Sequence, residues 1–315
     1  MNDYLVKALA FDDQVRIYCV RSTNTLNTIG ERLNYYPSAL AAVGRVLSVG
    51  TMMGAMLKNQ ETVTINVHGN GPIGKIIVDA NAHGEVRGYC DNPHVHFEYH
   101  NVGKLNVRDT VGDTGFISVI KDLQLKEPFI GTIPIINGEL GEDFAYYFNV
   151  SEQVPSAVSL GVLVGTDNRA IAAGGFIIQL LPNASEEVVD KLEKLIANLP
   201  SVSSLLSNGE SCEDIIKRIS GNDHRILDTI PVTFKCNCSR ERFEKGLISL
   251  GPGELEEIIA SDGKADVVCH FCGNEYHFDK EQLEGLYNEA KASIDAKASI
   301  DAKASKETSN EAKDE

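Results

Sequence analysis

Four cysteines near the carboxyl end of the chain form two close pairs. Cys236 and Cys238 lie in the sequence CNC, and Cys269 and Cys272 lie in CHFC. Structural Zn²⁺ prefers four ligands in a tetrahedron, and cysteine thiolates are often supplied to it as two close pairs from separate chain segments. The spacing therefore predicts one Zn²⁺ per chain in the reduced state, bound by these four cysteines.

The two pairs differ in their expected local geometry. In CHFC the two intervening residues turn the chain back, and Gly273 permits a backbone angle that other residues resist. In CNC both cysteine side chains point to the same side if the segment is extended. Residues two apart on a strand lie near the upper limit of disulfide Cα separation, so a bond between Cys236 and Cys238 needs a local bend. Oxidation of this pair is expected to disturb the backbone as well as to release the metal.

Several histidines must be weighed as further ligands. Because four cysteines complete the shell, we expect neither His270 nor His277 to bind the metal. The group His94, His96 and His100 resembles a second metal site. However, the sequence HVHFEYH alternates like a strand and has no other ligands nearby, so we predict exposed histidines on an edge strand.

The three remaining cysteines are isolated in the sequence. Cys19 and Cys90 lie in apolar strands, where we expect buried, unreactive thiols. Cys212 lies in a candidate hinge and could take part in disulfide exchange. Paired cysteines without a secretion signal indicate metal binding or redox chemistry in a reducing compartment, which predicts a cytoplasmic protein.

Charge and length narrow the class of protein. The 315 residues are too many for one ordinary core, which suggests two or three domains. The net charge is −16, and four basic against seven acidic residues lie between Cys238 and Cys269. Such a surface repels phosphate backbones, so we predict no nucleic-acid partner.

One apolar stretch, residues 38–57, has the length of a membrane span. Arg45 lies near its middle, and a charge at the centre of a bilayer costs about 2.5–3.5 kcal/mol even on lenient insertion scales. Its Ala, Gly and Ser residues suit close helix packing. We therefore predict a helix buried in a protein core and no membrane partner.

The fold class predicted is α+β. Residues 1–181 are expected to form a mixed α/β core domain with a hairpin near the amino end and a buried last strand. Its predicted strands are residues 5–10, 15–21, 62–68, 73–80, 85–90, 116–122, 128–137 and 169–181, and its predicted helices are residues 24–36, 37–58 and 139–153.

The rest of the chain divides into three parts. Residues 182–230 are predicted to be a helical linker that begins with an amphipathic helix. From residue 201 to 229 apolar residues are sparser, which favours weakly docked short helices and a hinge. Residues 231–287 are predicted to form the zinc domain. Residues 288–315 contain ASIDAK twice and almost no large apolar residues, which predicts a disordered tail. The apolar positions of the amphipathic helix are Val188, Leu192, Leu195, Ile196 and Leu199.

The sequence resembles the redox-regulated heat-shock chaperones of bacteria, the thirty-three-kilodalton chaperonin family, over about residues 3–287. The resemblance is carried by two long stretches and by the CNC and CHFC pairs. The stretches are GNGPIGKIIVDANAHGEVRGYCDNP at residues 69–93 and LKEPFIGTIPIINGELGEDFAYYFNVSEQVPSAVSLGVLV at residues 125–164. The repeat-bearing tail beyond residue 290 and the three additional cysteines depart from the family's usual pattern.

The resemblance implies a holdase, a chaperone that binds unfolding client proteins and prevents their aggregation without ATP, and therefore not an enzyme. In this family the reduced, zinc-bound form is inactive. Peroxide with unfolding stress, or hypochlorous acid, oxidises the cysteines, zinc leaves, and the zinc domain and linker unfold. Active members form homodimers. Carried over to this chain, the redox disulfides are Cys236–Cys238 and Cys269–Cys272.

Two other functions are compatible with a four-cysteine motif. A zinc-ribbon nucleic-acid-binding protein would need basic residues and exposed aromatic residues around the ligands, whereas this segment is acidic. A thiol-disulfide oxidoreductase would place CxxC at the start of a helix, where the dipole lowers the thiol pKa. Gly273 and Asn274, which follow CHFC, are poor helix formers. No Ser/His/Asp arrangement or phosphate-binding glycine motif stands out.

Overall fold

The computed structural model describes residues 2–97 and 105–294, which form a mixed α/β fold. The chain divides into two compact units. The first ends at Cys236 and the second begins at Asn237. The segment predicted as a linker, residues 182–230, therefore belongs to the first unit.

A five-stranded antiparallel sheet forms one half of the first unit. It contains the predicted hairpin near the amino end and the predicted buried strand near residue 180. Two further strands, one at each edge, lie where we predicted no strand. In spatial order the strands are β10 (His224–Pro231), β1 (Tyr4–Ala10), β2 (Val15–Arg21), β9 (Ala170–Leu180) and β8 (Ser156–Val164).

A six-stranded sheet forms the other half of the first unit. Period-two alternation buries Val63, Ile65 and Val67 of its central strand on one face, as the β-branched sequence predicted. All neighbours are antiparallel except the short first strand, which is parallel to the second. The spatial order is β11 (Thr233–Phe234), β5 (Glu85–Cys90), β4 (Lys75–Asn81), β3 (Thr62–Gly69), β6 (Gly115–Asp122) and β7 (Phe129–Pro134).

Helix α2 (Pro37–Gly54) packs against strands of both sheets and is buried on all sides. Small residues make this possible: a Cβ on Gly44 would lie 2.4 Å from Leu26 Cδ2. Arg45, its only charged residue, is mostly buried and forms an ion pair with Glu139 at 3.0 Å. The prediction of a helix buried in a protein core is therefore confirmed. Among the described residues, no helix combines the length and apolar character that crossing a membrane requires.

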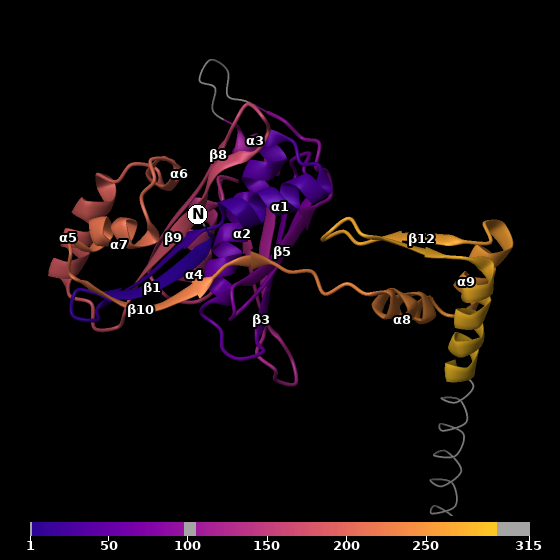
Figure 1. Ribbon diagram of the computed structural model, residues 1–315. Helices are drawn as coiled ribbons and strands as arrows, with labels where there is room; N and C mark the ends of the chain where they lie inside the picture. The colour runs from indigo at the N-terminus through magenta and orange to yellow at the C-terminus, as the bar shows by residue number, and fades with distance from the viewer. Residues whose placement is uncertain (1, 98–104, 295–315) are drawn as a thin grey trace, which may run out of the picture. The chain divides into compact units, whose positions relative to one another are not determined.

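The remaining helices of the first unit lie on either side of the five-stranded sheet (Figure 1). Helix α1 (Thr23–Leu33) packs with α2 on one side. Two shorter elements, α3 (Val107–Val111) and α4 (Gly141–Val150), complete that layer. Helices α5 (Glu186–Ala197), α6 (Val202–Ser207) and α7 (Cys212–Ser220) cover the opposite face.

The predicted linker is more firmly packed than we expected. Helix α7 buries Ile215, Ile216 and Ile219 completely against the sheet. Apolar residues are few in this segment, but those of α6 and α7 face the core, so their number underestimates the packing. The linker also ends in a strand: β10 pairs with β1 from Tyr4↔Pro231 to Ala10↔His224. The expectations of weak docking and of a wholly helical segment are therefore wrong.

The second unit is small. Its elements are α8 (Arg240–Leu250), α9 (Pro252–Ser261), β12 (Ala265–Val268), β13 (Glu275–Phe278) and a helix over residues 280–294. Its core of buried residues consists of Leu247, Leu255, Phe278, Leu283, Leu286 and Ala290. The final helix extends past residue 287, where we predicted the tail to begin, because Ala290 still packs in this core. The rest of the predicted tail, residues 295–315, lies outside the described residues.

Candidate metal centre

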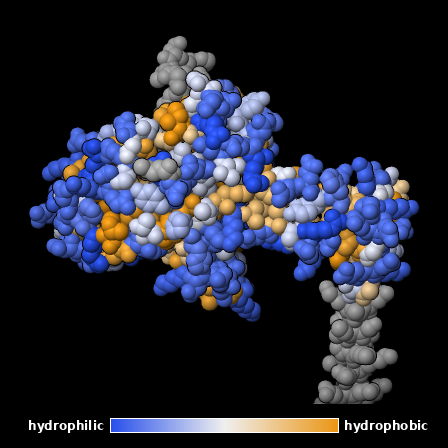
Figure 2. Space-filling model, viewed as in Figure 1, coloured by the Kyte–Doolittle hydropathy of each residue, from blue (hydrophilic) through white to orange (hydrophobic). Residues whose placement is uncertain are grey.

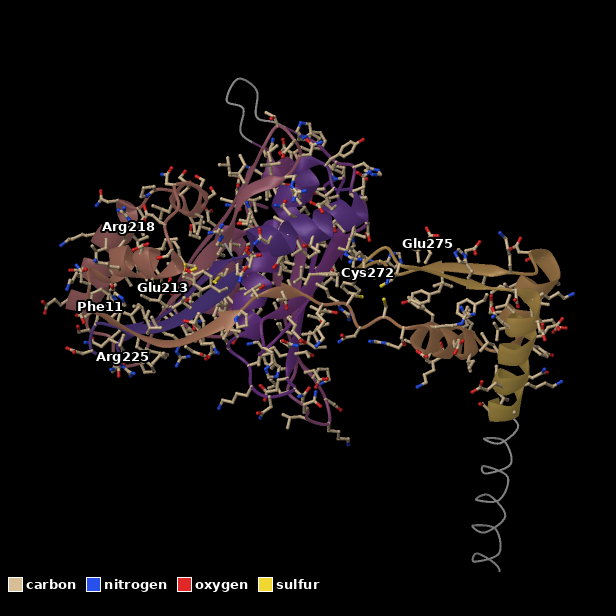
Figure 3. The ribbon with its side chains drawn as sticks, viewed as in Figure 1. Phe11, Glu213, Arg218, Arg225, Cys272 and Glu275 are labelled. Carbon is tan, nitrogen blue, oxygen red and sulfur yellow. The ribbon has the colours of Figure 1, made fainter. Side chains whose placement is uncertain are left out.

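The CHFC pair lies at the tip of the β12–β13 hairpin. The strands pair up to Val268↔Glu275, and the Cys269 amide donates a hydrogen bond to the Asn274 carbonyl at 2.9 Å. The Gly273 amide donates to the Cys269 carbonyl at 2.8 Å, and Gly273 has a φ of 72°. This left-handed conformation is the one that the glycine was predicted to permit. The tight turn directs both cysteine side chains to one place (Cys272 is labelled in Figure 3).

The CNC pair lies between β11 and α8. Before it, the Lys235 amide donates to the Val86 carbonyl at 3.1 Å, and the Lys235 ammonium forms an ion pair with Glu85. After it, the Ser239 hydroxyl accepts a hydrogen bond from the Arg242 amide at 3.3 Å and so caps α8. The segment that carries Cys236 and Cys238 is thus preceded by a backbone hydrogen bond and an ion pair, and it is followed by the side-chain cap of α8.

The structure brings all four predicted cysteines together. Their Sγ atoms all lie within 4.8 Å of one another, and those of Cys238 and Cys272 are 3.4 Å apart. Four thiolates about 2.3 Å from a tetrahedral Zn²⁺ lie about 3.8 Å apart, so this donor set fits such an ion. Cys269 and Cys272 are buried, whereas Cys236 and Cys238 are half-buried. An oxidant can therefore approach the site from the CNC side.

A tyrosine that carries no local sequence signal for metal binding contacts the four-cysteine cluster. The Tyr276 hydroxyl donates a hydrogen bond to Cys238 Sγ at 3.2 Å. This hydrogen bond is the main cause that raises the pKa of Tyr276 to about 12. The ring packs on Phe243 with 4.8 Å between centroids. A hydroxyl donor stabilises a thiolate, so Tyr276 favours the charged form of Cys238 that a metal requires.

The histidines do not join the four sulfurs. The group of potential ligands around the cysteines contains neither His270 nor His277. The His277 Nδ1 atom instead lies 2.6 Å from an Asp266 carboxylate oxygen, and its side chain is 68% exposed. Of the second histidine group, His94 and His96 are exposed as predicted, but they lie in a turn and an irregular segment rather than on a strand. His100 lies outside the described residues.

The position of CHFC bears on the oxidoreductase alternative. Cys269 follows strand β12 and precedes a tight turn, whereas a redox enzyme uses the amino end of a helix to lower the pKa of its attacking thiol. The geometry around Cys269 therefore favours a metal ligand over an enzymatic nucleophile.

Comparisons with known proteins identify the family. The family model described as Hsp33 protein matches residues 3–279. A 33 kDa chaperonin of Geobacillus sp. (strain WCH70) is 51% identical over 293 residues, which cover 93% of this chain and 99% of that protein. One of Bacillus mycoides (strain KBAB4) is 53% identical over 287 residues, covering 91% and 99%. The crystal structure of the 33 kDa chaperonin from Thermotoga maritima superimposes with a TM-score of 0.86 at 35% identity, covering 94% of this chain and all of that one. The chain belongs to the Hsp33 family.

Proposed function

We propose that this chain is a redox-regulated, ATP-independent holdase that binds unfolding proteins and prevents their aggregation under oxidative stress. Membership of the Hsp33 family, whose relatives carry the name chaperonin, supports the chaperone role. The observation that carries the redox part is the cluster of four cysteine sulfurs within 4.8 Å of one another. In the reduced state Cys236, Cys238, Cys269 and Cys272 hold Zn²⁺, which keeps the thiolates apart from wrong partners.

Oxidation removes the ligands. In each pair two zinc-bound thiolates give two electrons to one peroxide, which takes up two protons from solvent: the O–O bond breaks, an S–S bond forms, two waters leave and the metal loses both ligands. We propose the pairs Cys236–Cys238 and Cys269–Cys272, since each joins near neighbours. A structural zinc site supplies about 10–16 kcal/mol of apparent binding energy, which is folding energy in a small domain. With six buried core residues in its described part, the second unit has little to replace this energy.

The apolar surface for clients lies beneath the helices of residues 182–230. Helices α5, α6 and α7 cover one face of the five-stranded sheet, including Val6, Ile17 and Phe176, which are all buried. In Figure 2 hydrophilic residues cover much of the visible surface, and apolar residues form separate patches. Withdrawal of these helices would expose a continuous apolar face, which is what a holdase needs.

The chain offers a path for this change. Strand β10 follows α7, and β11 then leads directly to Cys236. Disorder that begins at the cysteine cluster therefore reaches the two-residue strand β11 and then β10, and β10 is an edge strand with most of its residues exposed. Helix α5 is the least firmly held of the covering helices, because only Leu192 is buried in it. We propose that β10 and α5 open before α7.

The remaining features of the proposal concern assembly and place. Two activated chains would cover part of their newly exposed faces by pairing, so we propose a homodimer in the active state. The paired cysteines suit a reducing compartment, the cytoplasm, in which oxidation is an exceptional event.

The test is an aggregation assay with a heat-denatured client and no ATP. The full reduced chain should leave aggregation unchanged, the chain treated with peroxide at mild heat should suppress it, and a thiol reductant should reverse the effect. Cys90→Ser, which alters a buried cysteine of the six-stranded sheet, is the matched control and should switch normally. If reduced and oxidised protein suppress client aggregation equally, the zinc site has a structural role only and the redox switch is refuted.

Trypsin cleavage tests the proposed order of opening. After oxidation, cutting at Lys191 and Lys194 in α5 should precede cutting at Lys217 in α7. Simultaneous cutting at all three sites would show that the covering helices open as one unit.

A further inference from the structure

Two cysteines outside the metal cluster lie side by side in the first unit. Cys19 is on β2 and Cys212 is the first residue of α7, and both are completely buried. Along β2, alternation places Val15, Ile17 and Cys19 on the face that the covering helices occupy. The two thiols share a hydrogen bond, which together with burial raises the pKa of Cys19 well above its ordinary value.

The surroundings hold Cys212 in place. Its Sγ lies 4.0 Å from the Tyr4 carbonyl oxygen on β1, the strand next to β2, and its amide donates to the Tyr4 hydroxyl at 3.2 Å. That hydroxyl donates in turn to Glu213 Oε2 at 2.8 Å. The Ser211–Asp214 capping box fixes the start of the helix. Figure 3 shows the labelled Glu213 between α7 and the sheet.

We propose that Cys19 and Cys212 form a second redox site, a disulfide that fastens α7 covalently to strand β2. The disulfide forms by two-electron oxidation of the two thiols. An oxidant such as peroxide takes two electrons and two protons from the two thiols, its O–O bond breaks, two waters form, and the sulfurs bond to each other.

Burial sets the order of events at this site. While α7 is docked, neither thiol meets the oxidant, so the pair stays reduced. When α7 opens, one thiol is oxidised to a sulfenic acid, and the other thiol can displace its hydroxyl group only after α7 returns to the sheet. The disulfide therefore captures the docked form. It joins residues far apart in the sequence, so it removes much of the freedom that α7 would gain on opening.

This bond would oppose the metal site rather than assist it. On the function proposed above, opening of residues 182–230 exposes the client surface. A Cys19–Cys212 disulfide would keep α7 over the sheet and restrict the exposure to α5 and its neighbours. Only this effect on client exposure rests on the function proposed above. The Cys19–Cys212 disulfide itself does not.

Peptide mapping tests the bond directly. The zinc-loaded full chain is treated with diamide at mild heat, at which α7 opens and returns to the sheet. It is then denatured, blocked with an alkylating agent and digested with trypsin without reduction. Cys19 falls in the peptide of residues 17–21 and Cys212 in that of residues 195–217, so the pair gives one distinctive cross-linked mass. We expect this mass to be the main disulfide form of Cys19 in folded protein and a minor one after oxidation in concentrated guanidinium chloride. Cys19 recovered mainly as the alkylated thiol, or linked mainly to another cysteine, would overturn the proposal.

Protease sensitivity tests the fastening. In oxidised wild-type protein, cutting after Lys217 should be at least tenfold slower than in Cys212→Ala, and a reductant should abolish the difference. Cys90→Ala is the matched control, because it removes another buried core thiol and leaves the pair intact. Equal cutting in wild type and Cys212→Ala would refute the fastening even if the cross-linked peptide is present. Neither result depends on whether the protein suppresses aggregation, so the two proposals can fail separately.

Discussion

The two compact units reach stability by different means. In the first, α2 lies between two sheets, and 41 buried residues form one continuous apolar cluster around it. In the described part of the second, the corresponding cluster has six buried residues, and this unit supplies three of the four clustered cysteines, the fourth being Cys236 at the end of the first unit. Apolar burial cannot be withdrawn by a chemical reaction, whereas a thiolate site can. On the function proposed above, the smaller unit can therefore be switched, because most of its stability would lie in one oxidisable centre.

Removal of one metal ligand should produce the largest difference in folding between the two units. Cys269→Ser should lower the zinc content and withdraw a large part of the roughly 10–16 kcal/mol that a structural zinc site supplies. We expect the NMR signals of the second unit to collapse to unfolded positions, while those of the first unit remain. Zinc measured after exhaustive dialysis gives the stoichiometry.

Cys90→Ser serves as the control for that experiment and should keep one zinc per chain. An unchanged zinc content in Cys269→Ser would show that Cys269 is not a ligand. Loss of order in both units at once would contradict the claim that only the second unit depends on zinc.

Shortening one buried side chain in each core tests which unit depends on zinc for its stability. Phe144→Ala in the first unit and Phe278→Ala in the second each empty a fully buried site, at a cost of about 3–5 kcal/mol. Zinc should compensate for this cost in the second unit, because its contribution is larger. Phe278→Ala should therefore be folded when zinc-loaded but lose zinc to a chelator at far lower concentration than wild type. Phe144→Ala should lower the unfolding midpoint of the first unit and leave chelator resistance unchanged. Equal chelator resistance in both variants would contradict this reasoning.

The smallest expected effect concerns the hydrogen bond to the cluster. Tyr276→Phe keeps the ring on Phe243 but removes the donor to Cys238 Sγ. Because the hydroxyl donates to the thiolate form that a metal requires, zinc affinity should fall severalfold, which is less than in the variants above. Competition with a zinc-binding dye measures it, with Tyr287→Phe as the control in the same unit. A stronger affinity in Tyr276→Phe would show that the hydroxyl competes with the metal for the sulfur.

Much of the fold could be predicted because local pattern and tertiary environment agree. The alternation in β3 and β4, the small residues of α2 and the helical spacing of α5 each match the burial in the structure. Strands β8 and β10 were missed because both are edge strands. Most of their residues are only partly buried or exposed, so the apolar alternation that marks a central strand is weak in them.

The clustering of the four cysteines could be predicted from the sequence, whereas the residues that contact them could not. Two cysteine pairs at short spacing are an unusual local signal, and Gly273 adds the turn that CHFC needs. The contact of Tyr276 with Cys238 and that of Cys19 with Cys212 join residues remote in sequence. Such contacts depend on how strands and helices pack, which no local pattern reports. Cys212 in particular was expected in a hinge, yet α7 is a well-packed helix.

The central position of α2 has a consequence for the synthesis of the chain. Its apolar surface is completed by β9, which begins 116 residues after α2 ends (170 − 54). At translation rates of about 5–20 residues per second, this helix waits about 6–23 s for the last strand that covers it. During that interval the nascent chain displays a long apolar segment with Arg45 as its only charge, which is itself a target for other chaperones. Until the later strands are made, the nascent chain is therefore itself an aggregation-prone unfolded chain.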